Sequence, residues 1–226
     1  MGYMKKVKCF EKMQYVVSFP RQYREGNKYP IIIFLHGAGS RGENIDLLLD
    51  NPYFKLTEEH QEFPYITIAP QCFTDSWFDL FETLERFVHQ ILEEQFTDPE
   101  RIYLMGASMG GYATWQLAMS LPECFAAIVP ICGGGMYWNA ARLINVPVWA
   151  FHGAKDPIVF ADESRKMVDA VCAVGGNAKL TIYPENAHDA WSDTYRSAKV
   201  FQWLLTKKNE NKKNTSNKYI GSKLFG

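Results

Sequence analysis

The chain has 226 residues, a hydrophobic content of 47%, an aromatic content of 15% and a formal net charge of -1 at pH 7. These values are typical of one globular domain with a substantial core. The near-neutral charge gives no sign of a nucleic-acid-binding surface, and no apolar run is long enough to span a membrane. We therefore expect neither a nucleic-acid nor a membrane partner, and the composition carries no signal of the oligomeric state.

The N-terminus contains early lysines but lacks the apolar stretch and the small-residue cleavage site of a signal peptide. Five cysteines, odd in number and widely spaced, fit reduced thiols better than a disulfide framework. The motifs C-x-x-C and H-E-x-x-H do not occur, so the sequence predicts no metal site. Together these features predict a cytoplasmic protein without a cofactor.

Apolar runs that recur along the chain predict strands at 14–20, 29–35, 65–69, 102–105, 126–131, 147–151 and 179–183. Segments of helical pattern lie between them, at about 80–94, 109–120, 162–174 and 190–205. Most of the strands are apolar throughout, as expected when both faces of a sheet are covered. The alternation predicts an α/β fold, a doubly wound and mostly parallel sheet in a single compact domain.

Two connecting segments have a composition of their own. Residues 97–100 (TDPE) predict a short turn, with Asp98 as a cap and Pro99 in a first helical position. From residue 207 the chain is polar, charged and without periodicity. We therefore expect a folded domain over residues 1–206 and a disordered tail over 207–226.

The loop after the strand at 29–35 contains Gly37, Gly39 and Gly42, which match the dinucleotide-binding pattern G-x-G-x-x-G. That fingerprint requires a helix that opens at once and a second strand that ends in an acidic residue. Here only a short helix fits between 43 and 50, and the next strand ends in Pro70-Gln71. A loop that turns a backbone N–H toward an active serine is the better interpretation. A plain glycine-rich turn is the structural alternative.

Residues 102–117 (IYLMGASMGGYATWQL) place the pattern G-x-S-x-G between a strand and a helix. In such a strand-to-helix turn the central serine is strained and exposed at the carboxyl end of the strand. Gly106 and Gly110 would leave room where strand and helix pass closely, and Gly111 would add more. An incidental serine in a glycine-rich turn is the alternative, but the order of strand, turn and helix favours a nucleophilic Ser108.

A serine nucleophile needs a base and an acid that orients the base. Asp156 and His188 also follow strands, and the chain order serine, acid, histidine is one of the known triad arrangements. Active sites gather at the carboxyl ends of parallel strands, so we expect these three residues to meet. The alternatives are His36 and His152 for the base, and Asp162, Asp189 and Asp193 for the acid.

These segments resemble the α/β-hydrolase superfamily, and they are most similar to its dienelactone-hydrolase, phospholipase/carboxylesterase and feruloyl-esterase-like groups. The resemblance covers about residues 29–205 and is carried by LHGAGSRGEN, RIYLMGASMGGYATW, PVWAFHGAKDPIV and NAHDAW. It implies that Ser108 is the nucleophile, Asp156 the acid and His188 the base. It also implies that the amides of Ala38 and Met109 form the oxyanion hole.

The resemblance further implies a carboxylesterase-type hydrolase that acts through an acyl-enzyme. Residues 132–146 are too few for a substantial lid, so we expect an open site for small acyl or aromatic-acyl esters, such as feruloyl or acetyl esters of sugars. Trp77, Trp138 and Trp191 lie on loops where they could line the pocket, or could equally be packing residues. A serine peptidase of the same fold and a non-catalytic binding module are the alternatives.

Overall fold

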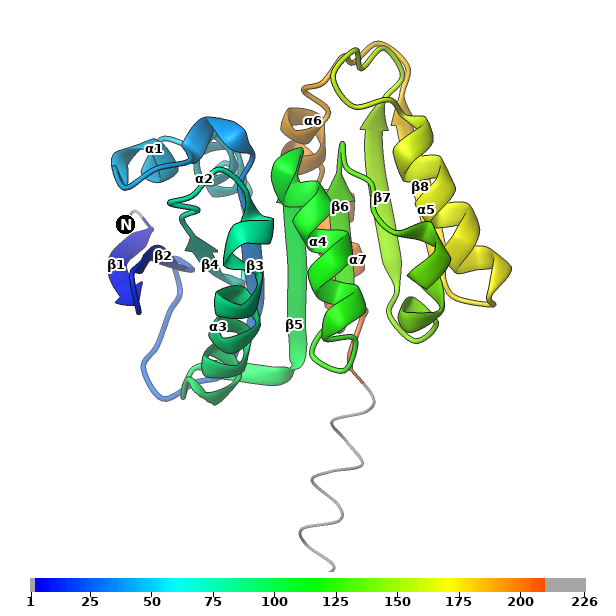
Figure 1. Cartoon of the computed structure of the whole chain (residues 1–226). Coiled ribbons are helices and arrows are strands. Elements are labelled where there is room, and N and C mark those ends of the chain that lie inside the picture. Colours follow the sequence, from blue (N-terminus) through cyan, green and yellow to red (C-terminus); the bar gives the residue numbers. More distant parts are fainter. Residues whose placement is uncertain (1–2, 210–226) are drawn as a thin grey trace, which may run out of the picture.

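The computed structural model describes residues 3–209, which form one eight-stranded sheet in the order β1-β2-β4-β3-β5-β6-β7-β8 (Figure 1). The strands are β1 (Met4–Phe10), β2 (Met13–Phe19), β3 (Tyr29–Leu35), β4 (Ile66–Pro70), β5 (Thr97–Ala107), β6 (Ala127–Ile131), β7 (Val148–Gly153) and β8 (Ala178–Tyr183). Every pair from β4 to β8 is parallel, whereas β1 and β2 pair antiparallel with each other and β2 with β4. The predicted mostly parallel sheet is confirmed.

Helices cover both faces of this sheet. One core contains side chains of α3 (Phe81–Glu93), α4 (Met109–Ser120) and α5 (Asp162–Ala173), which lie in front of the sheet in Figure 1. A second core contains side chains of α1 (Asp46–Leu49), α2 (Pro52–Glu58), α6 (Trp191–Arg196) and α7 (Ala198–Leu205). Three short 3-10 helices complete the fold: η1 (Ala38–Ser40), η2 (Trp77–Leu80) and η3 (Tyr137–Leu143).

Strand β3 explains why the sheet is buried on both sides. Its side chains alternate between faces, so that Ile31 and Ile33 enter the first core while Ile32 and Phe34 enter the second. All four side chains are completely buried. A central strand that packs against helices on both faces must be apolar throughout, and this explains the continuous apolar run in the sequence.

The first strand departs from what the sequence predicts. The apolar pattern predicts no strand over residues 4–10, yet β1 pairs along its whole length with β2. The apolar pattern is interrupted by Lys5, Lys6 and Lys8. These lysines are accommodated because β1 is the edge strand of the sheet and most of its side chains are exposed or half-buried. Charged residues are usual on an edge strand, since they discourage pairing with another chain.

Residues 97–100 belong to β5, so the expected turn is wrong. The ladder between β3 and β5 shifts its register between the pairs Tyr29–Thr97 and Ile31–Ile102. This irregularity accommodates Pro99, which has no N–H to donate. The Asp98 carboxylate accepts hydrogen bonds from the Glu100 amide and the Arg101 side chain and caps no helix.

The last helical segment is also different, because α6 and α7 are separated at Ser197, whose backbone is extended. Beyond α7, Lys207 and Asn209 still contact the domain. The Tyr103 hydroxyl donates to the Lys207 carbonyl, and the Asn209 amide donates to the Glu100 carbonyl. The remainder of the predicted tail, residues 210–226, lies outside the described residues.

The fold brings the ends of three strands together at one edge. The carboxyl ends of the parallel strands lie at the top of Figure 1, and Ser108, Asp156 and His188 follow β5, β7 and β8 there. The connection from β6 to β7 consists of η3 and a short loop on either side of it. Among residues 3–209, no helix combines the length and apolarity needed to cross a bilayer.

Candidate active site

Ser108 stands between β5 and α4 in a backbone conformation that L-residues rarely adopt, with φ 56° and ψ -117°. Such a conformation costs about 1–3 kcal/mol and persists only where its surroundings enforce it. Here the surroundings are tight. A Cβ atom at Gly106 would lie 2.3 Å from the Gly110 carbonyl oxygen, and one at Gly110 would lie 1.9 Å from the Leu35 carbonyl oxygen. The glycines on either side of Ser108 therefore allow strand and helix to approach closely, as expected.

The turn also fixes the direction of the backbone. The Ser108 amide donates to the Ile131 carbonyl at the end of β6. Met109 is the first residue of α4, so its N–H has no acceptor within the helix. The helix N-terminus therefore presents a donor and a positive dipole end next to the Ser108 side chain.

His188 links Ser108 to Asp156. Its Nε2 atom lies 2.8 Å from Ser108 Oγ, and its Nδ1 atom lies 2.7 Å from Asp156 Oδ2. Because an ionised carboxylate can only accept, Nδ1 carries the hydrogen and Nε2 is free to accept the Ser108 hydroxyl proton. This is the tautomer that a general base needs.

Contact between two loops brings the acid to the histidine. A Cβ atom at Gly153 would lie 2.0 Å from the Ala187 carbonyl oxygen, so the end of β7 touches the loop after β8. The amide of Lys155 also donates to the Asn186 carbonyl. These contacts place Asp156 beside His188, although the two residues are far apart in the sequence.

The Asp156 carboxylate is almost completely buried and well supplied with donors. Its Oδ1 atom accepts from the amides of Ile158 and Val159, at 2.9 and 3.0 Å. Burial alone raises the pKa of Asp156, but the hydrogen bonds from His188, Val159 and Ile158 outweigh it and hold that pKa below the usual value. Asp156 is therefore an anion at neutral pH, ready to stabilise a protonated His188.

The competing acids are engaged elsewhere. The Asp189 carboxylate accepts from the amide and hydroxyl of Ser192, Asp193 accepts from the Asn186 side chain, and Asp162 pairs with Arg165. Of the competing histidines, His36 lies under the loop after β3, and His152 lies beneath Asp156.

His36 braces the predicted oxyanion loop. Its Nε2 atom accepts from the Cys72 amide, so its Nδ1–H donates to the Gly37 carbonyl at 2.6 Å. Burial lowers the pKa of His36 to about 4, which keeps the ring neutral and this pattern intact at neutral pH. A Cβ atom at Gly37 would lie 3.5 Å from Ser108 Cβ, so the loop passes directly beside the strand-to-helix turn that carries Ser108. Ala38, the first residue of η1, follows at once and has no acceptor for its N–H within η1.

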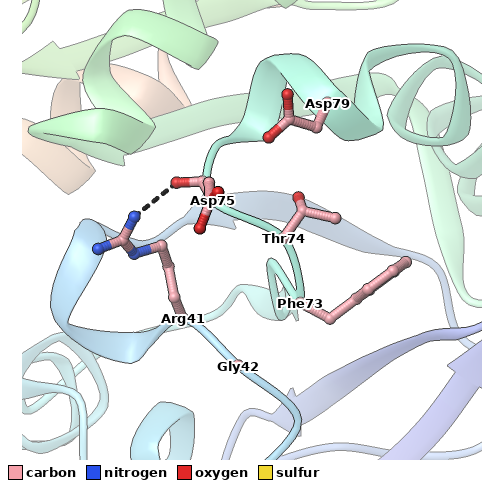
Figure 2. A pocket seen from close by; sticks show the side chains of 6 residues that line it. All are labelled: Arg41, Gly42, Phe73, Thr74, Asp75 and Asp79. Atoms are coloured by element: carbon pink, nitrogen blue, oxygen red, sulfur yellow. Dashed lines mark hydrogen bonds between the residues drawn. The ribbon is translucent and has the colours of Figure 1, made fainter.

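The Arg41 side chain holds the outer side of the same loop through two hydrogen bonds, and the sequence did not predict this role for Arg41. Its side chain donates to the Ala38 carbonyl at 3.1 Å and to the Asp75 carbonyl at 2.6 Å. Figure 2 shows the guanidinium reaching across to the 73–79 segment, beside a pocket of about 570 Å³. The Asp75 and Asp79 carboxylates also line this pocket, which makes it a polar space next to the predicted oxyanion loop.

A second pocket, of about 490 Å³, is mainly apolar. Phe78, Phe81 and Met136 line it, with Tyr112, Gln116 and Glu163 as polar members. Tyr112 lies one helical turn after Ser108, and its amide donates to the Ser108 carbonyl. The pocket therefore begins one turn of α4 away from the candidate nucleophile.

The three tryptophans predicted to line a pocket occupy different environments. Trp77 is fully buried, its ring lies against His36, and its indole N–H donates to the His36 carbonyl. Trp191 contacts the His188 ring edge-to-face, with 5.2 Å between ring centroids. Trp138 is 72% exposed and packs against the Tyr137 ring. The structure thus places Trp77 behind the predicted oxyanion loop, Trp191 on the candidate base and Trp138 on the surface.

Cys132, His152 and Asp156 bring potential metal-ligand atoms within 4.8 Å of one another. Each of these residues is already engaged in protein hydrogen bonds, and the Cys132 thiol donates to the His188 carbonyl. Burial raises the pKa of Cys132 to about 12, which disfavours the thiolate that a metal would require. We therefore interpret this cluster as part of the support for Asp156 and His188.

The chain is similar in sequence to known hydrolases and in fold to a solved esterase. The model of the dienelactone hydrolase family matches residues 60–219. A probable feruloyl esterase C of Aspergillus niger is 24% identical over 189 residues, which cover 80% of this chain and 69% of that protein. A solved thermostable esterase superimposes with a TM-score of 0.76 at 29% identity, over 91% of this chain and 63% of that one.

A peptidase is also similar. Dipeptidyl-peptidase 5 of Porphyromonas gingivalis is 20% identical over 219 residues, which cover 76% of this chain but only 32% of that protein. The chain thus spans about a third of the length of this relative and somewhat under two thirds of the solved esterase.

Proposed function

This chain belongs to the dienelactone hydrolase family, and from that membership we propose that it is a serine carboxylic-ester hydrolase that acts through an acyl-enzyme. Its catalytic triad would be Ser108, His188 and Asp156. The observation that carries the proposal is the unbroken run of hydrogen bonds from Ser108 Oγ through both ring nitrogens of His188 to Asp156.

The chemistry follows from these contacts. His188 Nε2 takes the hydroxyl proton as Ser108 Oγ attacks the ester carbonyl carbon, and Asp156 stabilises the imidazolium that results. The amides of Ala38 and Met109 donate to the oxyanion. Removal of one such donor typically costs on the order of 3 kcal/mol of transition-state stabilisation. The imidazolium then protonates the leaving alcohol, and a water molecule activated by His188 hydrolyses the acyl-enzyme.

The two pockets support an ester with an apolar acyl group. The pocket lined by Phe78, Phe81 and Met136 suits a short chain or an aromatic ring, and its volume of about 490 Å³ lies in the usual range for small ligands. The polar pocket beside Arg41 suits a hydroxyl-rich alcohol. Feruloyl and acetyl esters of sugars combine these features, and relatives named as a feruloyl esterase and a bifunctional acetylxylan esterase/xylanase agree with this choice.

A serine peptidase is the second candidate, favoured by the similarity to dipeptidyl-peptidase 5. The same triad would cleave an amide, so the two functions differ in the acceptable leaving group. A non-catalytic binding module is less well supported, because a module without activity has no need of the strained Ser108 backbone.

The test is a panel of chromogenic acetyl, long-chain acyl and feruloyl esters and peptide anilides, assayed with the wild type and with Ser108→Ala. Ser120→Ala, the same substitution at the far end of α4, is the matched control. We expect hydrolysis of acetyl and feruloyl esters by the wild type and by Ser120→Ala only, with covalent labelling of Ser108 by a fluorophosphonate. Equal activity of Ser108→Ala and wild type would overturn the assignment of the nucleophile. Hydrolysis of anilides alone would favour the peptidase.

A further inference from the structure

His152, at the end of β7, is a completely buried histidine whose two ring nitrogens both have protein partners. Its Nε2 atom lies 2.8 Å from the Val159 carbonyl oxygen and 3.2 Å from Asp156 Oδ2. Its Nδ1 atom lies 2.8 Å from the Ser164 hydroxyl on α5. The ring thus connects α5 with the loop that carries the proposed catalytic acid.

The identity of these partners determines where the hydrogens lie. The Val159 carbonyl can only accept, so Nε2 of His152 carries a hydrogen and donates to it, while Asp156 Oδ2 lies 3.2 Å from the same nitrogen. On the other side of the ring, the Ser164 hydroxyl lies within hydrogen-bonding distance of both Nδ1 and the Gly133 carbonyl. His152 is therefore fixed from both sides, with its Nε2–H group next to the Asp156 carboxylate.

The consequence is that Asp156 Oδ2 has two histidine neighbours. His188 approaches it at 2.7 Å from the solvent side and His152 at 3.2 Å from the interior. We propose that His152 is a positioning residue that holds the Asp156 carboxylate in the orientation required by His188. Its polar Nε2–H group, beside Asp156 Oδ2, also offsets part of the negative charge that the carboxylate presents to His188. This inference rests on the proposed triad, and it adds a residue that acts through Asp156 without touching the substrate.

Several other titratable groups surround this pair. Cys132 follows β6, and its sulfur lies within 4.8 Å of the nearest His152 and Asp156 ligand atoms. Glu163 precedes Ser164 on α5, Tyr112 faces from α4, and His188 faces from the loop after β8. Cys132 is a protonated thiol at neutral pH and Tyr112 a neutral phenol, since burial raises the pKa of each. Asp156 is therefore the charged group that lies against His152.

Two amide substitutions separate the functions of the two ring nitrogens. In His152→Gln the side-chain amide reaches the position of Nε2 and keeps an N–H group next to the Val159 carbonyl and Asp156. In His152→Asn the shorter amide reaches only the position of Nδ1 and contacts Ser164. Both variants have the same chemical group, so they form a matched pair. Each would be characterised by kcat, KM, the pH profile of kcat/KM and the urea midpoint of unfolding.

We expect His152→Gln to keep kcat within about threefold of wild type, and His152→Asn to lose about 10- to 100-fold in kcat with little change in KM, as for a small misplacement of a catalytic group. The acidic limb of the pH profile should move to higher pH in His152→Asn, because the carboxylate keeps more of its charge for the protonated base. A merely structural role would lower the urea midpoint and leave the pH profile in place.

The outcomes distinguish this inference from the proposed function. Equal kcat and equal pH profiles in the two amide variants would overturn the positioning role, even if Ser108 is labelled by a fluorophosphonate in both. Absence of labelling at Ser108 in the wild type would instead refute the triad, and the positioning role would fall with it.

Discussion

Gly153 and Ala187 pass so closely that a Cβ atom at residue 153 would lie 2.0 Å from the Ala187 carbonyl oxygen. The same Cβ atom would lie 2.4 Å from the Asn186 carbonyl oxygen. This crossing joins the loop that carries Asp156 to the loop that carries His188. The distance between the proposed acid and base is therefore set by a backbone contact that only glycine permits.

Substitution of Gly153 by alanine should accordingly separate the two loops. We expect Gly153→Ala to lower the free energy of unfolding by about 1–3 kcal/mol, as overpacking usually does. A displacement near 1 Å would lower kcat by about 100-fold. The measurements are urea unfolding and kcat on the preferred ester.

Gly175→Ala provides the control for this prediction. Gly175 follows α5 with φ +84°, and a Cβ atom added there would have nothing within 4 Å. The strain of a left-handed alanine costs about 1 kcal/mol of stability but touches no residue of the site. If Gly153→Ala and Gly175→Ala lose stability alike and both keep full kcat, the crossing does not control the triad.

His36 should make the stability of the protein depend on pH. Burial lowers its pKa from 6.5 to about 4 in the folded protein, so between these values the unfolded chain binds more protons than the folded one. Stability contributed by the neutral ring is therefore complete above pH 6.5 and is lost as the pH falls toward 4. At about 1.4 kcal/mol per pKa unit, the loss is about 3 kcal/mol.

The comparison that isolates this effect is urea unfolding of the wild type and of His36→Gln at pH 7, 5 and 4. The glutamine variant has no titrating group at this position, so its stability should decline less over the interval, whatever its value at pH 7. Identical pH dependence in both proteins would show that His36 is not the residue responsible.

Trp77 should contribute stability through its buried indole. Its Nε1–H donates to the His36 carbonyl at 3.0 Å, directly behind the predicted oxyanion loop. Trp77→Phe leaves that carbonyl without this donor and should cost about 1–3 kcal/mol in the free energy of unfolding. The same substitution at the exposed Trp138 should change stability by less than about 0.5 kcal/mol. Equal effects at the two positions would contradict the environments described for them.

Trp191 should influence catalysis through its edge-to-face contact with the His188 ring. Contacts between aromatic rings contribute about 0.5–1.5 kcal/mol, so loss of the indole should lower kcat by about 2- to 10-fold. Trp191→Ala should show this loss on every ester tested, whereas Trp191→Phe should retain most of the wild-type activity. An effect confined to KM for bulky esters would instead indicate direct contact with the substrate.

Much of this architecture is predictable from the sequence, for physical reasons that can be named. The strand predicted at 29–35 has its observed bounds, because a strand buried on both faces must be apolar throughout. Ser108 is recognisable because its turn demands glycines at fixed distances on both sides. The chain order of Ser108, Asp156 and His188 is likewise visible, since each follows an apolar strand.

Features that depend on neighbours distant in the sequence are not predictable in this way. The strand β1 has lysines where a buried strand would have apolar residues, because it lies at the edge of the sheet. The break at Ser197 leaves the helical pattern of residues 190–205 undisturbed. His152, at the end of β7, lies four residues before Asp156, and only the folded structure shows that the two side chains converge. Trp77, Trp138 and Trp191 look alike in the sequence but have three different environments.

The short connection between β6 and β7 has a kinetic consequence. Residues 132–147 consist of η3 and a short loop on either side of it, and no other helix forms there that could cover Ser108. An enzyme built in this way has no cover to displace at an oil–water boundary. Its rate should follow the concentration of dissolved ester through ordinary saturation, with no increase at the concentration where the ester forms micelles.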